Sequence, residues 1–259
     1  MLAAALAGLP GGAATPAALP PVLPLIMGQA LDENGKARPL PARQLKLFAL
    51  LEQGLGVRFE IRRYPWPRVE RSARSGEGLV FGLPLNEARQ AALRYSAPAL
   101  SNTLWLATRS DRTFNFDSLA DLRGKTVGAV RGYGYGEDFE QARGKLFQVA
   151  DDPSSRALRV RRLLLQRVDA VLFFQPSGRS AAELQAELLA IAAPLARELG
   201  LPASLRLAVL PKPVQVENHQ YFAIAHERDQ GLIERINAIL ARCAAARRTP
   251  GLPHSQSCG

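Results

Sequence analysis

The sequence predicts an α/β protein of two units, each a mainly parallel sheet flanked by helices. Short apolar runs alternate with segments of helical periodicity along most of the chain, which is typical of βαβ units. This alternation starts again after about a hundred residues, the size of an ordinary domain. The chain has 259 residues, of which 47% are hydrophobic, so both units can build a core. We expect the second unit to be inserted into the first.

The first unit is predicted from residues 24–81. A strand at 24–28 is followed by a helix at 43–55, an alternating strand at 57–62, a short helix at 67–75 and a buried strand at 79–81. Gly54 and Gly56 are stop signals for the longer helix.

The second unit begins with a strand at 101–108, and a helical turn capped by Asp117 follows. The remaining predicted elements are strands at 125–130, 168–174, 205–210 and 220–225, and helices at 137–143, 156–166, 181–198 and 230–246. We expect Pro194 to break the helix at 181–198. The helix at 230–246 is strongly amphipathic.

The charge of the chain is strongly basic, with 33 Lys and Arg against 23 Asp and Glu. The arginines are spread over many segments, where solvated helix faces explain them, and no basic-aromatic run or nucleic-acid-binding motif occurs. We therefore expect no nucleic-acid partner. No Cys/His spacing fits a metal site, no nucleophile elbow occurs, and the three histidines stand apart from any nucleophile in sequence.

The first residues of the chain favour export. Residues 1–9 form a short apolar core and 10–14 are small residues suited to cleavage, although no basic segment precedes them. We expect 1–14 to be a signal remnant, and no other apolar run approaches the roughly 20 residues of a spanning helix. Cys243 and Cys258 could close a loop by a disulfide in an oxidising compartment or remain two unpaired thiols.

A turn with one arginine follows the buried strand at 79–81. Pro84 and Asn86 build the turn, and Arg89 comes directly after it. A guanidinium has five donors in a rigid fork that suits two-point capture of a carboxylate. Arg89 is therefore a candidate ligand anchor, the alternative being one more solvated arginine.

A glycine-rich loop at 131–136 joins the predicted strand and helix on either side of it. Gly132, Gly134 and Gly136 allow close backbone approach or positive φ, and a helix start presents free amides to an anion. The loop is neither a Walker loop nor GxGxxG, so no nucleotide cofactor is expected. Tyr133 and Tyr135 could wall a small ligand or simply be exposed in a tight connection.

In combination, these segments resemble bacterial extracellular solute-binding proteins of family 3, the amino-acid-type periplasmic receptors of ABC transporters. The resemblance covers about residues 57–175 and a return segment. The matching pieces are 64–68 with Ser75 and Gly76, 82–90 with 96–98, 118–128, 131–137, 167–171 and 221–246.

The resemblance implies a type 2 periplasmic-binding fold, in which two α/β lobes joined by two crossing segments close on a ligand without chemistry. It implies a signal remnant at 1–14, lobe 1 at 15–105, lobe 2 at 106–212 and a return to lobe 1 at 213–259. It also implies a periplasmic monomer that binds a small anion and partners a membrane permease, with no cofactor, metal or membrane insertion.

The residues matching the family's ligand site define the predicted site. Arg89 falls on the carboxylate-binding arginine, and residues 132–135 fall on the loop that holds the same carboxylate. The full predicted set is Trp66, Gly82, Pro84, Asn86, Arg89, Gly132, Tyr133, Gly134, Tyr135 and Phe174.

Several of these residues depart from the family pattern. Pro84 and Asn86 replace hydroxyl residues, as Tyr133 and Gly134 do in the loop. Phe174, five residues after Asp169, stands where amino-acid receptors place a carboxylate for the ligand's ammonium. A buried ammonium without that partner is costly, so we expect an anionic or aromatic carboxylate that lacks an amino group, and a structural role for Asp169.

Two other functions remain open at this stage. The same fold supports dehydratases of the cyclohexadienyl type, which need a general acid or base in the cleft. A ligand-sensing module that docks on a membrane receptor is the other alternative.

Overall fold

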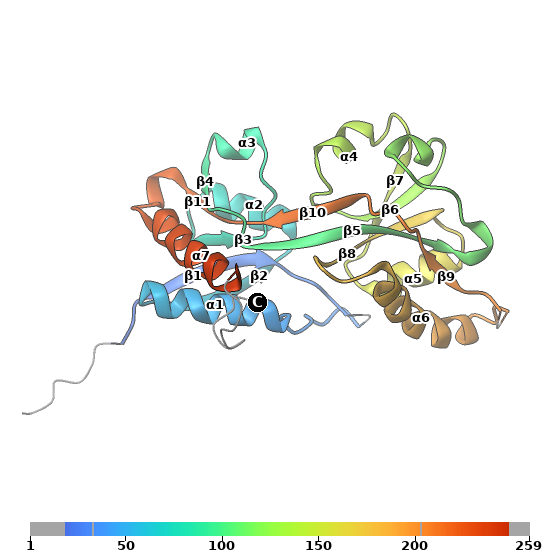
Figure 1. The fold of residues 1–259 in the computed structure, drawn as a ribbon, viewed down its shortest axis with the longest axis horizontal. Helices are drawn as coiled ribbons and strands as arrows, with labels where there is room; N and C mark the ends of the chain where they lie inside the picture. Colours follow the sequence, from blue (N-terminus) through green and yellow to red (C-terminus); the bar gives the residue numbers. More distant parts are fainter. Residues whose placement is uncertain (1–18, 33, 203, 249–259) are drawn as a thin grey trace, which may run out of the picture.

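Two β-sheets covered by helices form two lobes that lie side by side in the computed structural model, which describes residues 19–32, 34–202 and 204–248 (Figure 1). The sheet of lobe 1 has the strand order β2-β1-β3-β11-β4. Its strands are β1 (Val22–Gly28), β2 (Arg58–Tyr64), β3 (Leu79–Phe81), β4 (Leu93–Tyr95) and β11 (Phe222–Ala225). β1 is parallel to β2 and β3, and β11 is antiparallel to β3 and β4.

Helices cover both faces of the sheet in lobe 1. They are α1 (Ala42–Leu55), α2 (Trp66–Arg74), the short α3 (Glu87–Gln90) and α7 (Leu232–Arg248). Phe48 of α1 and Ile236 of α7 pack in one core cluster with Leu25, whereas Val69 of α2 packs in another with Ile26. Because neighbouring strand residues point to opposite faces, α1 and α7 cover one face and α2 the other.

The sheet of lobe 2 has the order β10-β5-β8-β6-β7, with β9 beside β5. Its strands are β5 (Leu100–Arg109), β6 (Thr126–Val130), β7 (Gln148–Asp152), β8 (Ala170–Pro176), β9 (Leu207–Val209) and β10 (Gln215–Gln220). Its helices are α4 (Glu137–Ala142), α5 (Arg156–Leu164) and α6 (Ala181–Glu198). Phe173 of β8 faces α5 and α6, while its neighbour Leu172 packs in the cluster that includes Phe139 of α4.

Two antiparallel strands, β5 and β10, carry the chain between the lobes (Figure 1). β5 follows the lobe 1 strand β4, and β10 leads into the lobe 1 strand β11. Lobe 2 is thus inserted into lobe 1, and the fold class predicted from the sequence is confirmed. The predicted boundary 105/106 falls inside β5, and 212/213 falls just before β10.

Two local predictions are wrong. The helical turn (a 3-10 helix) at Leu119–Leu122 begins at Ser118 rather than Asp117, and the Asp121 carboxylate accepts the backbone N–H groups of both residues at 2.8 Å. Pro194 lies inside a continuous α6. The buried face of that helix packs on the sheet, and this packing outweighs the cost of about 3 kcal/mol of an interior proline.

Three short or polar strands, β4, β7 and β10, have no counterpart in the prediction. β7 and β10 contain mostly polar residues, and β4 has only three residues. None of the three strands therefore shows a clear apolar alternation. Cys243 of α7 is buried and disulfide-bonded, whereas Cys258 lies outside the described residues, as does the predicted signal remnant. No helix in the described part of the chain has the length and apolar character needed to cross a membrane.

Candidate ligand-binding cleft

A cavity of about 590 Å³ lies between the lobes and is lined by residues of both. Lobe 1 contributes the ends of β1 and β3, the segment that leads into α1, and residues of β2 and α2. The crossing strands contribute Asn102 and Gln220, and lobe 2 contributes the start of α5 and parts of β8 and α6. A ligand in this cavity would contact both lobes and both crossing strands at once.

Aromatic rings form part of the wall. Trp66 of lobe 1 meets Tyr133 of lobe 2 edge to face, with ring centroids 5.9 Å apart. The Tyr133 ring lies 6.1 Å from the Phe174 ring, which also lines the cavity. These rings offer an apolar surface to the carbon frame of a ligand.

The charge of the cavity wall is strongly positive. Five arginines line it, namely Arg38, Arg43, Arg63, Arg156 and Arg159. Among the described residues the wall has one acidic side chain, that of Glu187, whose carboxylate accepts from Arg156 Nη1 at 2.6 Å. Five guanidinium groups and one carboxylate leave a formal excess of four positive charges.

Burial acts against these charges. Desolvation lowers the pKa of Arg43, Arg63, Arg156 and Arg159. The charge of Arg38, which belongs to lobe 1, also lowers the pKa of Arg156 in lobe 2. Guanidinium groups stay protonated in proteins, so the two lobes face each other with like charges. An anion between the lobes would relieve this repulsion.

Several buried polar atoms of the wall have no hydrogen-bond partner in the part of the chain that the structure describes. The donors are Nε of Arg43, Arg63 and Arg159 and Nε1 of Trp66, and the acceptors are Oε1 of Gln44 and Gln220. Unpartnered buried polar atoms are rare and costly in folded proteins. These atoms all belong to residues that line one cavity.

The wall offers no free carboxylate to a ligand's ammonium group. Glu187 is engaged by Arg156, and Phe174, for which the resemblance implied the place of an ammonium-binding carboxylate, lines the cavity with an apolar ring. Asp169 lies away from the cavity wall, and its carboxylate accepts the backbone N–H of Thr126 at 2.7 Å, in line with the structural role expected for it.

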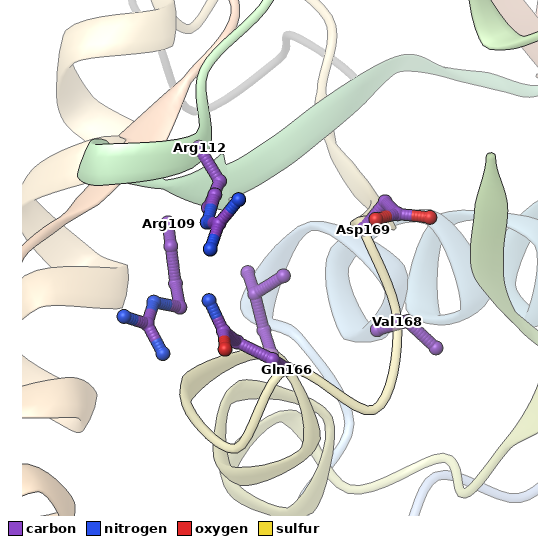
Figure 2. A pocket seen from close by; sticks show the side chains of 6 residues that line it. Arg109, Arg112, Gln166, Val168 and Asp169 are labelled. Carbon is purple, nitrogen blue, oxygen red and sulfur yellow. The ribbon is translucent and has the colours of Figure 1, made fainter.

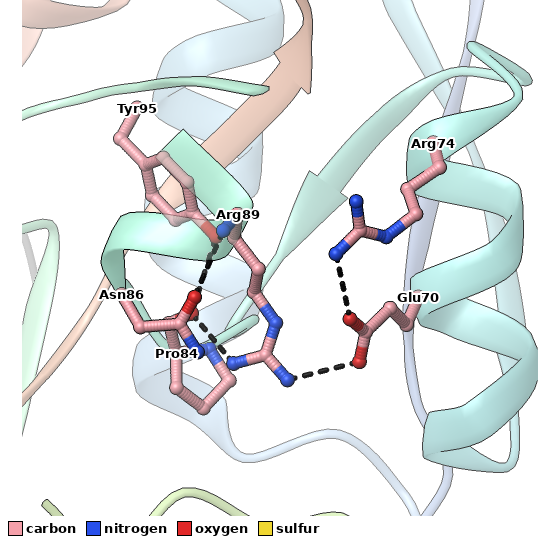
Figure 3. Close-up of polar contacts among 6 residues, drawn as sticks. All are labelled: Glu70, Arg74, Pro84, Asn86, Arg89 and Tyr95. Carbon is pink, nitrogen blue, oxygen red and sulfur yellow. Dashed lines mark hydrogen bonds and ion pairs between the residues drawn. The ribbon is translucent and has the colours of Figure 1, made fainter. Parts of the chain in front are cut away.

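Arg89, the predicted anchor, is engaged within lobe 1 (Figure 3). Its Nη2 donates to Glu70 Oε2 at 2.9 Å and its Nη1 to the carbonyl of Pro84 at 3.0 Å. The side chain of Asn86 accepts the backbone N–H of Arg89 and so begins α3. Arg89 does not line the cavity. Its guanidinium therefore already holds a carboxylate, that of Glu70.

Neighbouring groups fix this arrangement. Arg89 and Arg74 both pair with Glu70, and hydrogen bonding to Arg89 is the main reason that the pKa of Glu70 is lowered. Burial raises the pKa of Tyr95 to about 12, so its hydroxyl stays protonated and donates to the Pro84 carbonyl at 3.1 Å.

The glycine-rich loop brings the lobes into direct contact. A Cβ on Gly134 would lie 2.3 Å from Cγ of Pro84, and one on Gly132 would lie 2.7 Å from Cβ of Trp66. The loop of lobe 2 thus packs against the turn of lobe 1 that contains Pro84. In this closed arrangement Pro84, whose carbonyl accepts from Arg89, lies against the loop.

The predicted site residues divide into two groups. The residues that line the cavity are Trp66, Gly82, Tyr133 and Phe174, and those that do not are Pro84, Asn86, Arg89, Gly132, Gly134 and Tyr135. Tyr135 is 3% exposed, stacks on the Phe174 ring at 5.5 Å and accepts the backbone N–H of Val130 at its hydroxyl. Tyr135 is therefore part of the lobe 2 core. The sequence had suggested either the wall of a ligand site or an exposed position in a tight connection.

The predicted site did not include the polar residues on the other side of the cavity, above all Arg43, Gln44, Arg63 and Arg159. One signal was available. Arg159 lies one helical turn before Leu163 and therefore on the apolar face of α5, where a charged residue needs an explanation. Arg63 carries no such signal, because the sequence does not show which of the adjacent residues Arg62 and Arg63 faces the cavity.

A second, smaller pocket of about 220 Å³ lies within lobe 2, where the side chains of Arg109, Arg112 and Gln166 lie near one another (Figure 2). Arg109 donates to both carboxylate oxygens of Asp111 and to the carbonyl of Leu164. No residue of lobe 1 lines this pocket, so it differs from the interlobe cavity.

Comparison with solved structures places the chain in a class of folds: the two-lobed fold of the substrate-binding proteins of amino acid ABC transporters. One such structure is the amino acid ABC transporter substrate-binding protein AbpA from Streptococcus pneumoniae bound to L-arginine. It is 17% identical, with a TM-score of 0.62 over 87% of this chain and 90% of that chain.

Two further matches are arginine-binding proteins. The holo form of ArgBP from T. maritima is 19% identical, with a TM-score of 0.60 over 88% of this chain and 92% of that chain. An ancestral arginine-binding protein bound to arginine is 20% identical, with a TM-score of 0.59 over 88% of this chain and 94% of that chain. No family model and no curated protein matches the sequence.

The contact between Gly134 and Pro84 leads to a test of closure. In the Gly134→Ala variant the added methyl group collides with a backbone-fixed ring, so we expect the closed arrangement to be disfavoured. Small-angle X-ray scattering should show a larger radius of gyration than for the wild type. Truncating the ring in a Gly134→Ala/Pro84→Ala double variant should restore the wild-type value. An equal radius in the single variant and the wild type would contradict the closed contact.

Proposed function

We propose that this chain is the solute-binding component of an ABC transporter and captures a small carboxylate-bearing ligand, not an ordinary amino acid, between its lobes. The observation that carries the proposal is the interlobe cavity, whose wall has a formal excess of four positive charges and no free carboxylate. The protein would act outside the cytoplasmic membrane, as an exported binding protein that delivers its ligand to a membrane permease. It would bind without catalysing a reaction.

The arrangement of the crossing strands supports this mechanism. Because β5 and β10 join the lobes, a change in their backbone angles opens or closes the cavity as a hinge. A ligand that contacts both lobes binds the closed form better than the open form and so shifts the population toward closure.

The charges of the wall argue against an amino acid as ligand. Structures of similar fold contain arginine or glutamine, which carry an α-ammonium group. Here an ammonium group would face a net positive wall whose carboxylate is already paired. A carboxylate without an amino group meets a net positive wall and brings no positive charge of its own.

Thermal denaturation with a panel of ligands tests the proposal. We expect a carboxylate lacking an amino group to raise the melting temperature by about 5–10 °C when present at a hundredfold excess over its Kd. The twenty amino acids should give no shift, and isothermal titration should show one site. A larger shift with any amino acid than with every other carboxylate, or no shift with any carboxylate, would contradict the proposed function.

A further inference from the structure

The geometry points to a narrower class of ligand: we propose that the solute carries at least two carboxylate groups and a hydroxyl group, as in a hydroxylated di- or tricarboxylate. This inference rests on the function proposed above. It is carried by the unpartnered polar atoms and charges of the cavity and does not involve Arg89.

Lobe 1 provides the first group of donors. Arg43 donates to the carbonyl of Ser101 at 3.0 Å and Arg63 to that of Arg38 at 2.6 Å, which orients both side chains. The Nε of each guanidinium is buried without a partner. These two arginines, from different elements of the same lobe, are therefore positioned by the protein and left with unused donors.

Lobe 2 provides a second group at the start of α5. Arg159 is 7% exposed, and its guanidinium lies 4.5 Å from the centre of the Phe173 ring and donates to the Leu172 carbonyl at 2.9 Å. Among the described residues its Nε has no partner and no carboxylate forms an ion pair with it, because Asp152, which attracts it through space, is paired with Arg162. A nearly buried guanidinium without an ion pair is costly, so it calls for an anion.

One carboxylate cannot satisfy both lobes. With Arg156 paired to Glu187, a single negative charge would leave three of the four remaining positive charges uncompensated. Two or three carboxylates on one carbon frame would let the arginines of each lobe bind their own anionic group. Closure would then bring opposite charges together instead of like charges.

The hydroxyl group follows from the acceptors. Gln44 Oε1 and Gln220 Oε1 are buried in the same wall and lack a donor. A carboxylate cannot donate to them, and an ammonium group would meet the surrounding arginines. A neutral hydroxyl donates a hydrogen bond without adding positive charge.

A graded series of known anions tests the proposal by isothermal titration calorimetry with the full protein. Butyrate, succinate, malate and citrate add in turn a second carboxylate, a hydroxyl and a third carboxylate, and tricarballylate is citrate without its hydroxyl. We expect succinate to bind at least tenfold more tightly than butyrate, and malate and citrate roughly fivefold or more above succinate and tricarballylate. Butyrate or benzoate binding as tightly as succinate would overturn the requirement for two carboxylates. Equal affinity for malate and succinate, and for citrate and tricarballylate, would overturn the requirement for a hydroxyl group.

A matched pair of variants tests the arginines. Arg62 and Arg63 are neighbours in β2, but Arg63 lines the cavity whereas Arg62 pairs with Glu60 at 2.8 Å outside it. We expect Arg63→Met to weaken malate and citrate roughly tenfold or more and butyrate far less, and Arg62→Met, with the same change of net charge, to change neither. Equal losses in the two variants, or none in Arg63→Met, would overturn the assignment. If Arg63→Met fails to fold, Arg43→Met provides the same comparison.

The two proposals fail in different ways. Aspartate differs from malate in carrying an ammonium group in place of the hydroxyl. Aspartate binding above malate would contradict the proposed function. A monocarboxylate binding most tightly would leave that function standing and overturn the inference made here.

Discussion

Replacing Arg159 by methionine is expected to abolish measurable binding of citrate and malate. Arg159 is a nearly buried cation of the cavity wall, and among the described residues its Nε has no acceptor and no carboxylate forms an ion pair with it. A charge-assisted hydrogen bond lost in such a place costs about 1.5–3 kcal/mol, and the lost charge adds to this. We expect Kd to rise at least a hundredfold in isothermal titration.

The unliganded Arg159→Met protein should keep its free energy of unfolding to within about 2 kcal/mol. Methionine fills a similar volume, and it removes an unpaired charge from a buried place at the expense of one hydrogen bond to Leu172. Arg161→Met is the control, because Arg161 lies on the same helix but pairs with Glu198 at the surface. Unchanged binding in Arg159→Met would show that this guanidinium belongs to the scaffold alone.

Replacing Arg89 by alanine is expected to act mainly on stability. The variant loses the hydrogen bonds of Arg89 to Glu70 and Pro84, and we expect the free energy of unfolding to fall by about 2 kcal/mol. Urea denaturation measures this loss. If Arg89 were the ligand anchor expected from the sequence, the same variant would lose binding, so a parallel titration with citrate decides between an anchor and a structural arginine. Because Arg89 does not line the cavity, we expect Kd to change less than threefold.

The pH dependence of the free energy of unfolding tests whether Glu70 is the partner through which Arg89 stabilises the fold. Since the pKa of Glu70 is lowered in the folded protein, its ion pair stabilises the fold fully above the ordinary carboxyl pKa. The stabilisation is lost as pH falls through the lowered pKa. The difference in stability between the wild type and Glu70→Gln should therefore shrink as the solution is acidified. A difference in stability that does not change with pH would contradict the assignment of this stabilisation to the ionised Glu70 carboxylate.

The fold could be predicted well from the sequence because the spacing of apolar residues in a long helix or buried strand shows which positions are buried. The helix at 43–55 and the strand at 125–130 lie within one or two residues of α1 and β6. The strand β10 was missed because its six residues are mostly polar, and crossing strands owe their structure to pairing with β5 rather than to a buried face. Tertiary packing likewise holds Pro194 inside a helix.

The site was less predictable. Of the predicted residues, Trp66, Gly82 and Tyr133 follow strands or lie in a glycine-rich turn, Phe174 lies within β8, and all four line the interlobe cavity. Arg89 follows such a turn as well, but the sequence could not show that Glu70, 19 residues earlier, occupies its guanidinium. Arg43 and Arg63 come from segments that converge only in three dimensions. Long-range convergence of this kind leaves no periodic trace in a single sequence.

The excess of positive charge in the cavity also bears on the speed of capture. Charges that line a cleft focus the electric field outward, so an anion is drawn toward the opening before it makes any contact. Dissolved salt screens this attraction over about 8–10 Å at ordinary ionic strengths. Encounter should therefore slow as salt is added, whereas escape, which requires the short-range bonds to break, should change little. The arginines that hold the solute would thus also set how quickly a dilute solute is collected.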